Sequence, residues 1–134
     1  MGKIFGYESV VNCKGCSIEA VRNLDNIKAF VAEVIEKTDM KAMGELHSHY
    51  LPDTPEYREK GLVGWSICQF LETSSCVMHL CEDPENNTGT LYLNYFSCKK
   101  FDDDIVIVLL KKYFGFDTCN NVYLVRDVDE ESFF

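Results

Sequence analysis

The sequence predicts an α/β fold: a two-layer α/β sandwich in which two helices pack on one face of a mainly antiparallel sheet. About six segments have the β-branched and aromatic content of strands, and two longer segments repeat apolar residues at the spacing of an amphipathic helix. The chain has 134 residues, 46% of them hydrophobic, which fits one packed core and leaves no room for a second. We therefore expect residues 1–134 to form a single domain.

The first elements expected along the chain are a strand and a helix. Residues Phe5 to Val11 are rich in β-branched and aromatic side chains and run into a Cys-Lys-Gly-Cys turn, so we predict a strand there. A short helical turn over Ile18 to Asn23 follows, and Asp25 is expected to cap a longer helix. The apolar residues of this helix recur at i, i+3, i+4, i+7 and i+8 as Ile27, Phe30, Val31, Val34 and Ile35.

The central part of the chain is expected to contain strands separated by polar segments. Lys41 to Leu51 is a weak strand candidate, Pro52 to Lys60 is a polar loop, and Gly64 to Leu71 and Ser75 to Cys81 are two further strands. These last two strands nearly meet at Glu72-Thr73-Ser74, which lacks the glycine or asparagine of a usual tight hairpin. We therefore expect an unusual connection there.

The C-terminal part of the chain is expected to contain two strands and one helix. Three acidic residues, Asp102 to Asp104, stand at the start of the helix, where negative charge favours the helix dipole. In chain order, the expected elements are a polar turn over Glu82 to Gly89, a strand over Thr90 to Phe96, a helix ending near Phe114, a strand over Val122 to Val125 and a frayed acidic tail over Asp127 to Glu131.

The sheet face that the helices leave open needs a cover if it is apolar. A second copy of the chain is the simplest cover, so we expect a homodimer that forms through the sheet layer. The long polar loop is the alternative cover. The apolar strand residues that suggest such a face are Val63, Ile67, Phe70, Val77, Leu91, Leu93 and Tyr95.

The charge balance and the cysteines restrict the partners and the location of the protein. Thirteen basic against twenty-two acidic residues give a net charge of −9, which disfavours nucleic acid and anionic membranes and favours a cationic small molecule. The N-terminal residues show no signal-peptide pattern, and the longest strongly apolar run, Ile105 to Leu110, is too short to span a bilayer. We expect a cytoplasmic protein whose seven cysteines are reduced.

Two groups of residues could suggest a metal ion, and we expect neither to bind one. Cys13-x-x-Cys16 has no second Cys-x-x-Cys to complete a tetrahedral zinc site. His47 and His49 would share one face of a strand, but no acidic or cysteine partner stands at a helpful spacing.

A set of hydroxyl, imidazole and thiol residues lies on the neighbouring central strands. Ser66 of a Gly64-x-Ser66 motif stands eight residues before Ser74, His79 follows Ser74 by five residues, and Cys98 ends a Phe-Ser-Cys sequence. This order and spacing resembles the small, prokaryotic-type S-adenosylmethionine decarboxylases, and the resemblance covers nearly the whole chain.

The resemblance implies that the chain makes its own cofactor, a pyruvoyl group derived from Ser74. By this resemblance, Ser74 Oγ attacks the carbonyl of Thr73, and the chain splits between Thr73 and Ser74 into fragments 1–73 and 74–134. His79 would take the α-proton during the elimination, and Ser66 would assist through hydrogen bonding.

The family's reaction implies S-adenosylmethionine as the substrate and spermidine synthesis as the destination of the product. The substrate amine would form a Schiff base with the pyruvoyl carbonyl, which accepts the electrons of decarboxylation, and Cys98 would return a proton. Either Glu82 or Glu85 would supply an acid that contacts the substrate, as an acid in this region does in the family, and we favour Glu85 because a proline precedes it.

An aromatic side chain beside the site could stabilise the substrate sulfonium through a cation–π contact. Phe5, Tyr7 and Trp65 are the candidates for this role.

Two alternatives remain open at the level of the sequence, because Thr73 stands where the family typically has glutamate. The first is a relative that does not process itself and degrades S-adenosylmethionine as a lyase. The second is a non-enzymatic relative that acts as a binding or regulatory partner.

Overall fold

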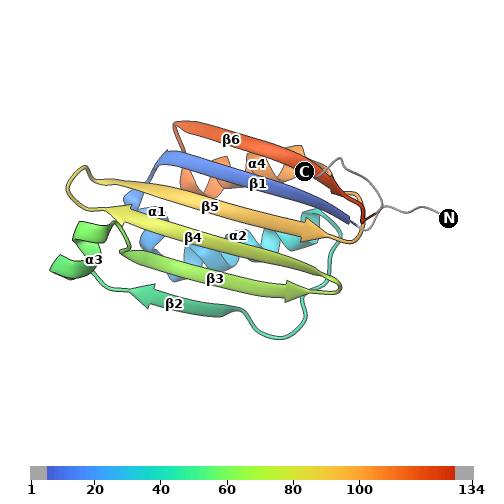
Figure 1. The fold of residues 1–134 in the computed structure, drawn as a ribbon, viewed down its shortest axis with the longest axis horizontal. Coiled ribbons are helices and arrows are strands. Elements are labelled where there is room, and N and C mark those ends of the chain that lie inside the picture. The colour runs from blue at the N-terminus through green and yellow to red at the C-terminus, as the bar shows by residue number, and fades with distance from the viewer. Residues whose placement is uncertain (1–5, 129–134) are drawn as a thin grey trace.

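Six antiparallel strands form a single sheet in the order β2-β3-β4-β5-β1-β6 (Figure 1). The computed structural model describes residues 6–128. The strands are β1 (Gly6–Cys16), β2 (His47–Leu51), β3 (Gly64–Leu71), β4 (Ser74–Asp83), β5 (Thr88–Ser97) and β6 (Thr118–Arg126).

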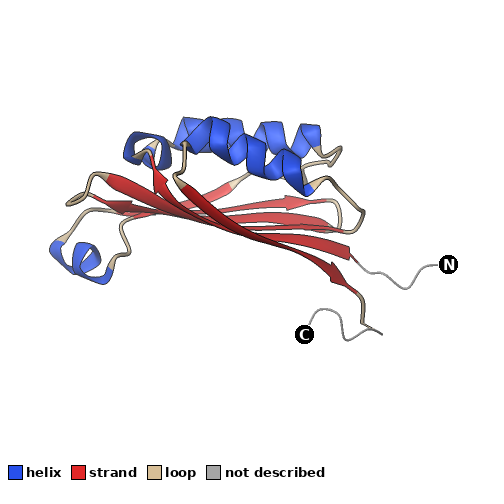
Figure 2. Ribbon diagram, turned by 90° about the horizontal axis from the view of Figure 1, so that it is seen from above, coloured by secondary structure: helices blue, strands red, loops and turns tan. Residues whose placement is uncertain are grey.

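Helices cover one face of this sheet and leave most of the other face open. The helices are α1 (Ile18–Arg22), α2 (Leu24–Lys37), α3 (Pro55–Lys60) and α4 (Asp103–Phe114). Figure 2 shows α1, α2 and α4 on one side of the sheet and the short α3 on the opposite side, at one end. The predicted α/β sandwich is therefore confirmed. No helix among residues 6–128 is long and apolar enough to cross a membrane.

The core lies between the sheet and helices α2 and α4. The five apolar residues predicted for α2 are all buried, as are Val106, Leu109, Leu110 and Phe114 of α4. The cap of α2 differs from the prediction, because Asn23 and not Asp25 accepts the first free backbone N–H, that of Asn26, at 3.2 Å. Asp25 instead lies in the first turn, where its charge favours the helix dipole.

Two segments predicted as turn or loop are regular structure. Strand β1 continues through Cys16, because Gly15 adopts φ +71° and forms a bulge where the Asp117 side chain occupies the space of a Cβ atom. The segment predicted as a polar loop contains α3, which Thr54 caps by accepting from the Tyr57 N–H at 3.2 Å. The sequence Thr-Pro-Glu at its start is typical of a helix N-terminus, but the polar composition of the segment favoured the prediction of a loop.

Several strand limits also differ from the prediction. Of the weak strand candidate over 41–51, only β2 is a strand, and Ala42 forms an isolated bridge with Leu71. Strand β6 is longer than predicted because it pairs with β1 along nearly all of that strand. Of the predicted acidic tail, Asp127 is buried, and residues 129–131 lie outside the described residues.

The list of apolar residues predicted for the open face mixed the two faces of the sheet. Alternation along the strands places Phe70 and Val77 on the open face, which also exposes Tyr92 and Val122. The other five residues are buried on the helix side or just before β3, namely Val63, Ile67, Leu91, Leu93 and Tyr95.

Candidate active site

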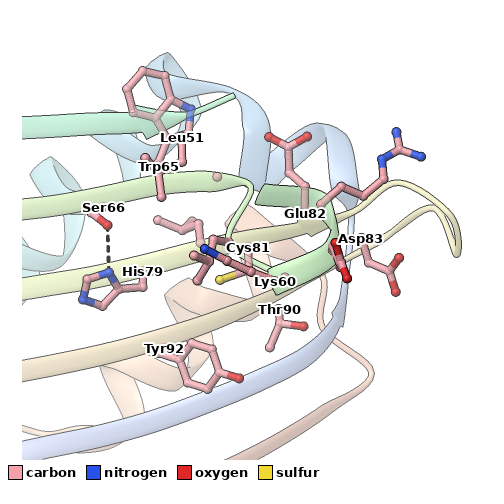
Figure 3. A pocket seen from close by; sticks show the side chains of 16 residues that line it. Leu51, Lys60, Trp65, Ser66, His79, Cys81, Glu82, Asp83, Thr90 and Tyr92 are labelled. Carbon is pink, nitrogen blue, oxygen red and sulfur yellow. Dashed lines mark hydrogen bonds between the residues drawn. The ribbon is translucent and has the colours of Figure 1, made fainter. Parts of the chain in front are cut away.

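Ser66 on β3 and His79 on β4 face each other on the open side of the sheet. The register of the two strands pairs them directly, and Ser66 Oγ lies 2.9 Å from His79 Nδ1 (Figure 3). The second ring nitrogen of His79 points away from Ser66, and the residue is exposed. An imidazole that a hydroxyl orients in this way can take or donate a proton at its free nitrogen.

A cleft of about 680 Å³ surrounds this pair and continues across β4 and β5 towards α3. Tyr92 lies in this cleft, directly opposite His79 in the β4–β5 register, and it is 45% exposed. Lys60 of α3 and Cys81 also border the cleft (Figure 3). Sequence reasoning missed Tyr92. The alternation of its strand assigns it to the open face, but only the register of β4 and β5 places it beside His79.

Ser74 and Cys98 come together at the other end of β4. Ser74 Oγ accepts a hydrogen bond from the Cys98 N–H at 3.1 Å, and Ser74 is only 7% exposed. The Cys98 side chain is exposed, with Sγ 3.9 Å from the Glu72 carbonyl oxygen. A second hollow of about 450 Å³ borders Thr73 and Cys98 together with Lys41 and other neighbours.

The two pairs do not meet within one chain. Ser74 and His79 are five residues apart on the extended strand β4, which corresponds to about 17 Å. The buried side chain of Ser74 lies on the helix side of the sheet, whereas His79 lies on the open side. One chain therefore holds two half-sites, Ser66–His79 and Ser74–Cys98.

Glu82 is buried within an internal network, with only 2% of its side chain exposed. Its carboxylate accepts from Arg22 Nε at 3.1 Å and from the Tyr50 hydroxyl at 2.8 Å. Burial, together with this hydrogen bond to Glu82, raises the pKa of Tyr50 to about 12. Trp65 belongs to the same network, because its Nε1–H donates to the Arg22 carbonyl at 2.9 Å. Both Glu82 and Trp65 border the cleft while their polar atoms are engaged inside the protein.

Two other predicted substrate contacts, Glu85 and Tyr7, do not line the Ser66–His79 cleft. Glu85 is exposed in the β4–β5 turn and does not line that cleft. Tyr7 stacks on Tyr123 with ring centroids 6.0 Å apart. Phe5 lies outside the described residues. Of the two aromatic candidates within residues 6–128, Trp65 borders the cleft and Tyr7 does not, and the roles of Glu82 and Glu85 stay predictions.

Of the residues considered for a metal site, the two cysteines are buried and the two histidines lie on an edge strand. Cys13 and Cys16 are buried, and burial raises the pKa of the Cys16 thiol to about 11 and that of Cys13 further still. His47 and His49 lie on the edge strand β2. Within residues 6–128, no three histidine, cysteine or acidic side chains are grouped to hold a metal ion.

Comparison with known proteins agrees with the resemblance in the motifs. A sequence model described as S-adenosylmethionine decarboxylase matches residues 7–127. The fold is similar to the crystal structure of the adenosylmethionine decarboxylase from Aquifex aeolicus, with a TM-score of 0.69, 11% identity and coverage of 97% of both chains. A search of curated proteins finds no match. The predicted family is confirmed, and with it the expectation of an enzyme. Because the match spans most of the sequence, the chain belongs to the S-adenosylmethionine decarboxylase family.

Proposed function

We propose that this protein decarboxylates S-adenosylmethionine with a pyruvoyl group made from Ser74, and so supplies the aminopropyl donor for spermidine synthesis. The contact between Ser74 Oγ and the Cys98 N–H is the main support. It holds the hydroxyl at the backbone of Cys98, a residue whose thiol is exposed, and Ser74 directly follows the carbonyl that it would attack. Family membership supports the same reaction.

The proposed self-cleavage uses only atoms of the chain and one water molecule. Ser74 Oγ bonds to the carbonyl carbon of Thr73 and the peptide C–N bond breaks, which leaves an ester and a free Ser74 amine. Removal of the Ser74 α-proton then expels the Thr73 carboxylate from Cβ. Tautomerisation of the resulting dehydroalanine and its hydrolysis release ammonia and leave the pyruvoyl group on fragment 74–134.

The surroundings of Ser74 fit this group, because the side chain is nearly buried and the Cys98 N–H is within hydrogen-bond distance. When formed, the group supplies the electron sink that decarboxylation of an amino acid requires. Cys98 is the proposed donor of the proton that replaces the lost carboxylate, since its thiol is exposed at this end of the sheet.

We propose that a second copy completes the site. A base that removes the Ser74 α-proton must lie within hydrogen-bond distance, yet His79 of the same chain is about 17 Å away. A homodimer packed through the open face would bring the Ser66–His79 half-site of one chain to the end of the other chain's β4, where the Ser74 backbone carries the α-proton and the Cys98 thiol is exposed. The exposed Phe70 and Val122 on that face support the packing.

The same proposal includes a cytoplasmic location and no nucleic-acid partner. All seven cysteines are unpaired, which suits a reducing compartment, and the net charge of −9 disfavours phosphate backbones.

The intact mass of the purified protein under denaturing conditions tests the cleavage. We expect two fragments, 1–73 and 74–134, the second carrying a pyruvoyl group in place of the serine amine. Ser74→Ala should abolish the split. The matched control Ser75→Ala changes a neighbouring serine whose side chain lies on the opposite face, and it should split normally.

A single full-length mass after long incubation would contradict this proposal. Product analysis with S-adenosylmethionine would then separate the alternatives. Release of methylthioadenosine would indicate a lyase, and binding without turnover would indicate a regulatory relative.

A further inference from the structure

Thr73 adopts an unusual backbone conformation in the connection between β3 and β4. The strands are joined by the two-residue turn Glu72-Thr73, and Leu71 pairs with Ser74 across it. Thr73 has φ +52°, in the left-handed region. The carbonyl of this residue is the one that Ser74 Oγ attacks in the proposed cleavage.

Threonine is a poor residue for this conformation. A turn with positive φ at its second central position favours glycine or asparagine, and a β-branched residue there is a clear outlier. The other non-glycine residues with positive φ in the described part of the chain are Asp39 and Asn87, which tolerate the left-handed region. Thr73 is thus the one β-branched residue of 6–128 held in it.

Contacts on both sides of the turn keep this conformation from relaxing. The Glu72 N–H donates to the Lys41 carbonyl at 3.0 Å, and the Ser74 hydroxyl accepts from the Cys98 N–H at 3.1 Å. The Thr73 side chain itself is exposed, so burial of its methyl group does not explain the choice of residue. The neighbouring loops therefore hold strain at the Thr73–Ser74 peptide.

We infer that Thr73 is a positioning residue for self-cleavage, because its left-handed backbone raises the free energy of the peptide that must break. This inference rests on the proposed function. Attack by Ser74 Oγ replaces the peptide link with a longer, more flexible ester, and the elimination then separates the turn from β4. The strain is therefore released as the reaction proceeds, and the rate rises.

Variants that accept a left-handed backbone test this inference. Thr73→Gly and Thr73→Asn should split about tenfold more slowly than the wild type, measured as fragment mass against time after refolding. Thr73→Val retains the branched Cβ and should split faster than Thr73→Gly. The matched control is Asn87→Gly, which changes a residue with the same φ of +52° in the distant β4–β5 turn and should leave the rate unchanged.

A second measurement detects the strain without cleavage. In the Ser74→Ala chain, which cannot split, adding Thr73→Gly should raise Tm by about 4 °C, because the native strain is removed. A wild type that splits while Thr73→Gly splits at the same rate, or an unchanged Tm, would overturn the role of Thr73. A wild type that stays whole would instead overturn the proposed function, whatever Tm shows.

Discussion

Tyr92 places an aromatic ring in the Ser66–His79 cleft, where it can contact a cationic substrate. Its ring is exposed on the open face and lies opposite His79, whose other cross-strand neighbour is Ser66. An aromatic face of this kind attracts a cation such as a sulfonium. Tyr92 is therefore a better candidate for that contact than Tyr7, whose ring stacks within the protein, or Trp65, whose indole N–H is bonded to Arg22.

Tyr92→Ala should raise KM for S-adenosylmethionine about tenfold, because the cation loses the aromatic face. Tyr92→Phe keeps the ring and should have nearly the wild-type KM. Steady-state kinetics of the self-cleaved enzyme measure both values, and the fragment masses check that processing is intact. An alanine variant with wild-type KM would remove Tyr92 from substrate recognition.

At the scale of elements, the Arg22–Glu82 pair connects α1 to β4, and Tyr50 connects β2 to the same carboxylate. Glu82 is almost fully buried, so these partners must replace the hydrogen bonds with water that its carboxylate has lost. The ion pair between Arg58 of α3 and Asp53, just before that helix, offers a comparison. The side chains of Arg58 and Arg22 are equally exposed, at 43%. Only the burial of the carboxylate differs strongly, at 2% against 38%.

Arg22→Ala should lower the free energy of unfolding by about 2 kcal/mol, since it leaves a buried carboxylate with less compensation. Arg58→Ala should lower it by less than about 1 kcal/mol, as expected for an exposed ion pair. Urea denaturation of the Ser74→Ala chain measures both without interference from cleavage. Equal losses in the two variants would show that the Glu82 network does not stabilise the fold.

The helices and strands were predictable wherever a local pattern was strong. The stripe of α2 and the alternation of β3 each identify an element by its own residues. Helix α3 was not predicted because its six residues are too few and too polar to show an apolar period. The signals available for it were Thr54 as the cap and Pro55 at the first helical position. The full length of β6 was not predicted because its pairing with β1 sets that length, and the two strands lie at opposite ends of the sequence.

At the scale of the whole molecule, the separation of the two half-sites makes assembly testable. In a mixed dimer of a Ser74→Ala chain and a His79→Ala chain, one site would combine intact Ser74 with intact His79. Co-expression in equal amounts should therefore split about half of the His79→Ala chains, as random pairing in a closed dimer requires. Each variant alone should stay whole.

Denaturing mass spectrometry separates the two variants by mass and so reports which chain has split. Splitting only in the mixture would show that the half-sites act across copies. A mixture with no split chains would place His79 action within one chain and would contradict the proposed dimer. Splitting of the His79→Ala chain by itself would instead place His79 outside the reaction.

The sequence by itself determined the elements that have a strong helical period or strand alternation, and the family spacing of the reactive residue types, because period, alternation and motif order are local properties. Only the tertiary structure decided which side chains meet. The β3–β4 register pairs Ser66 with His79, and the β4–β5 register, with Ser75 opposite Phe96, brings the Cys98 N–H to Ser74. Register depends on turn geometry and on pairing between distant segments, so the pattern of one strand cannot reveal it. For that reason one motif that looks continuous in the sequence becomes two half-sites about 17 Å apart along β4.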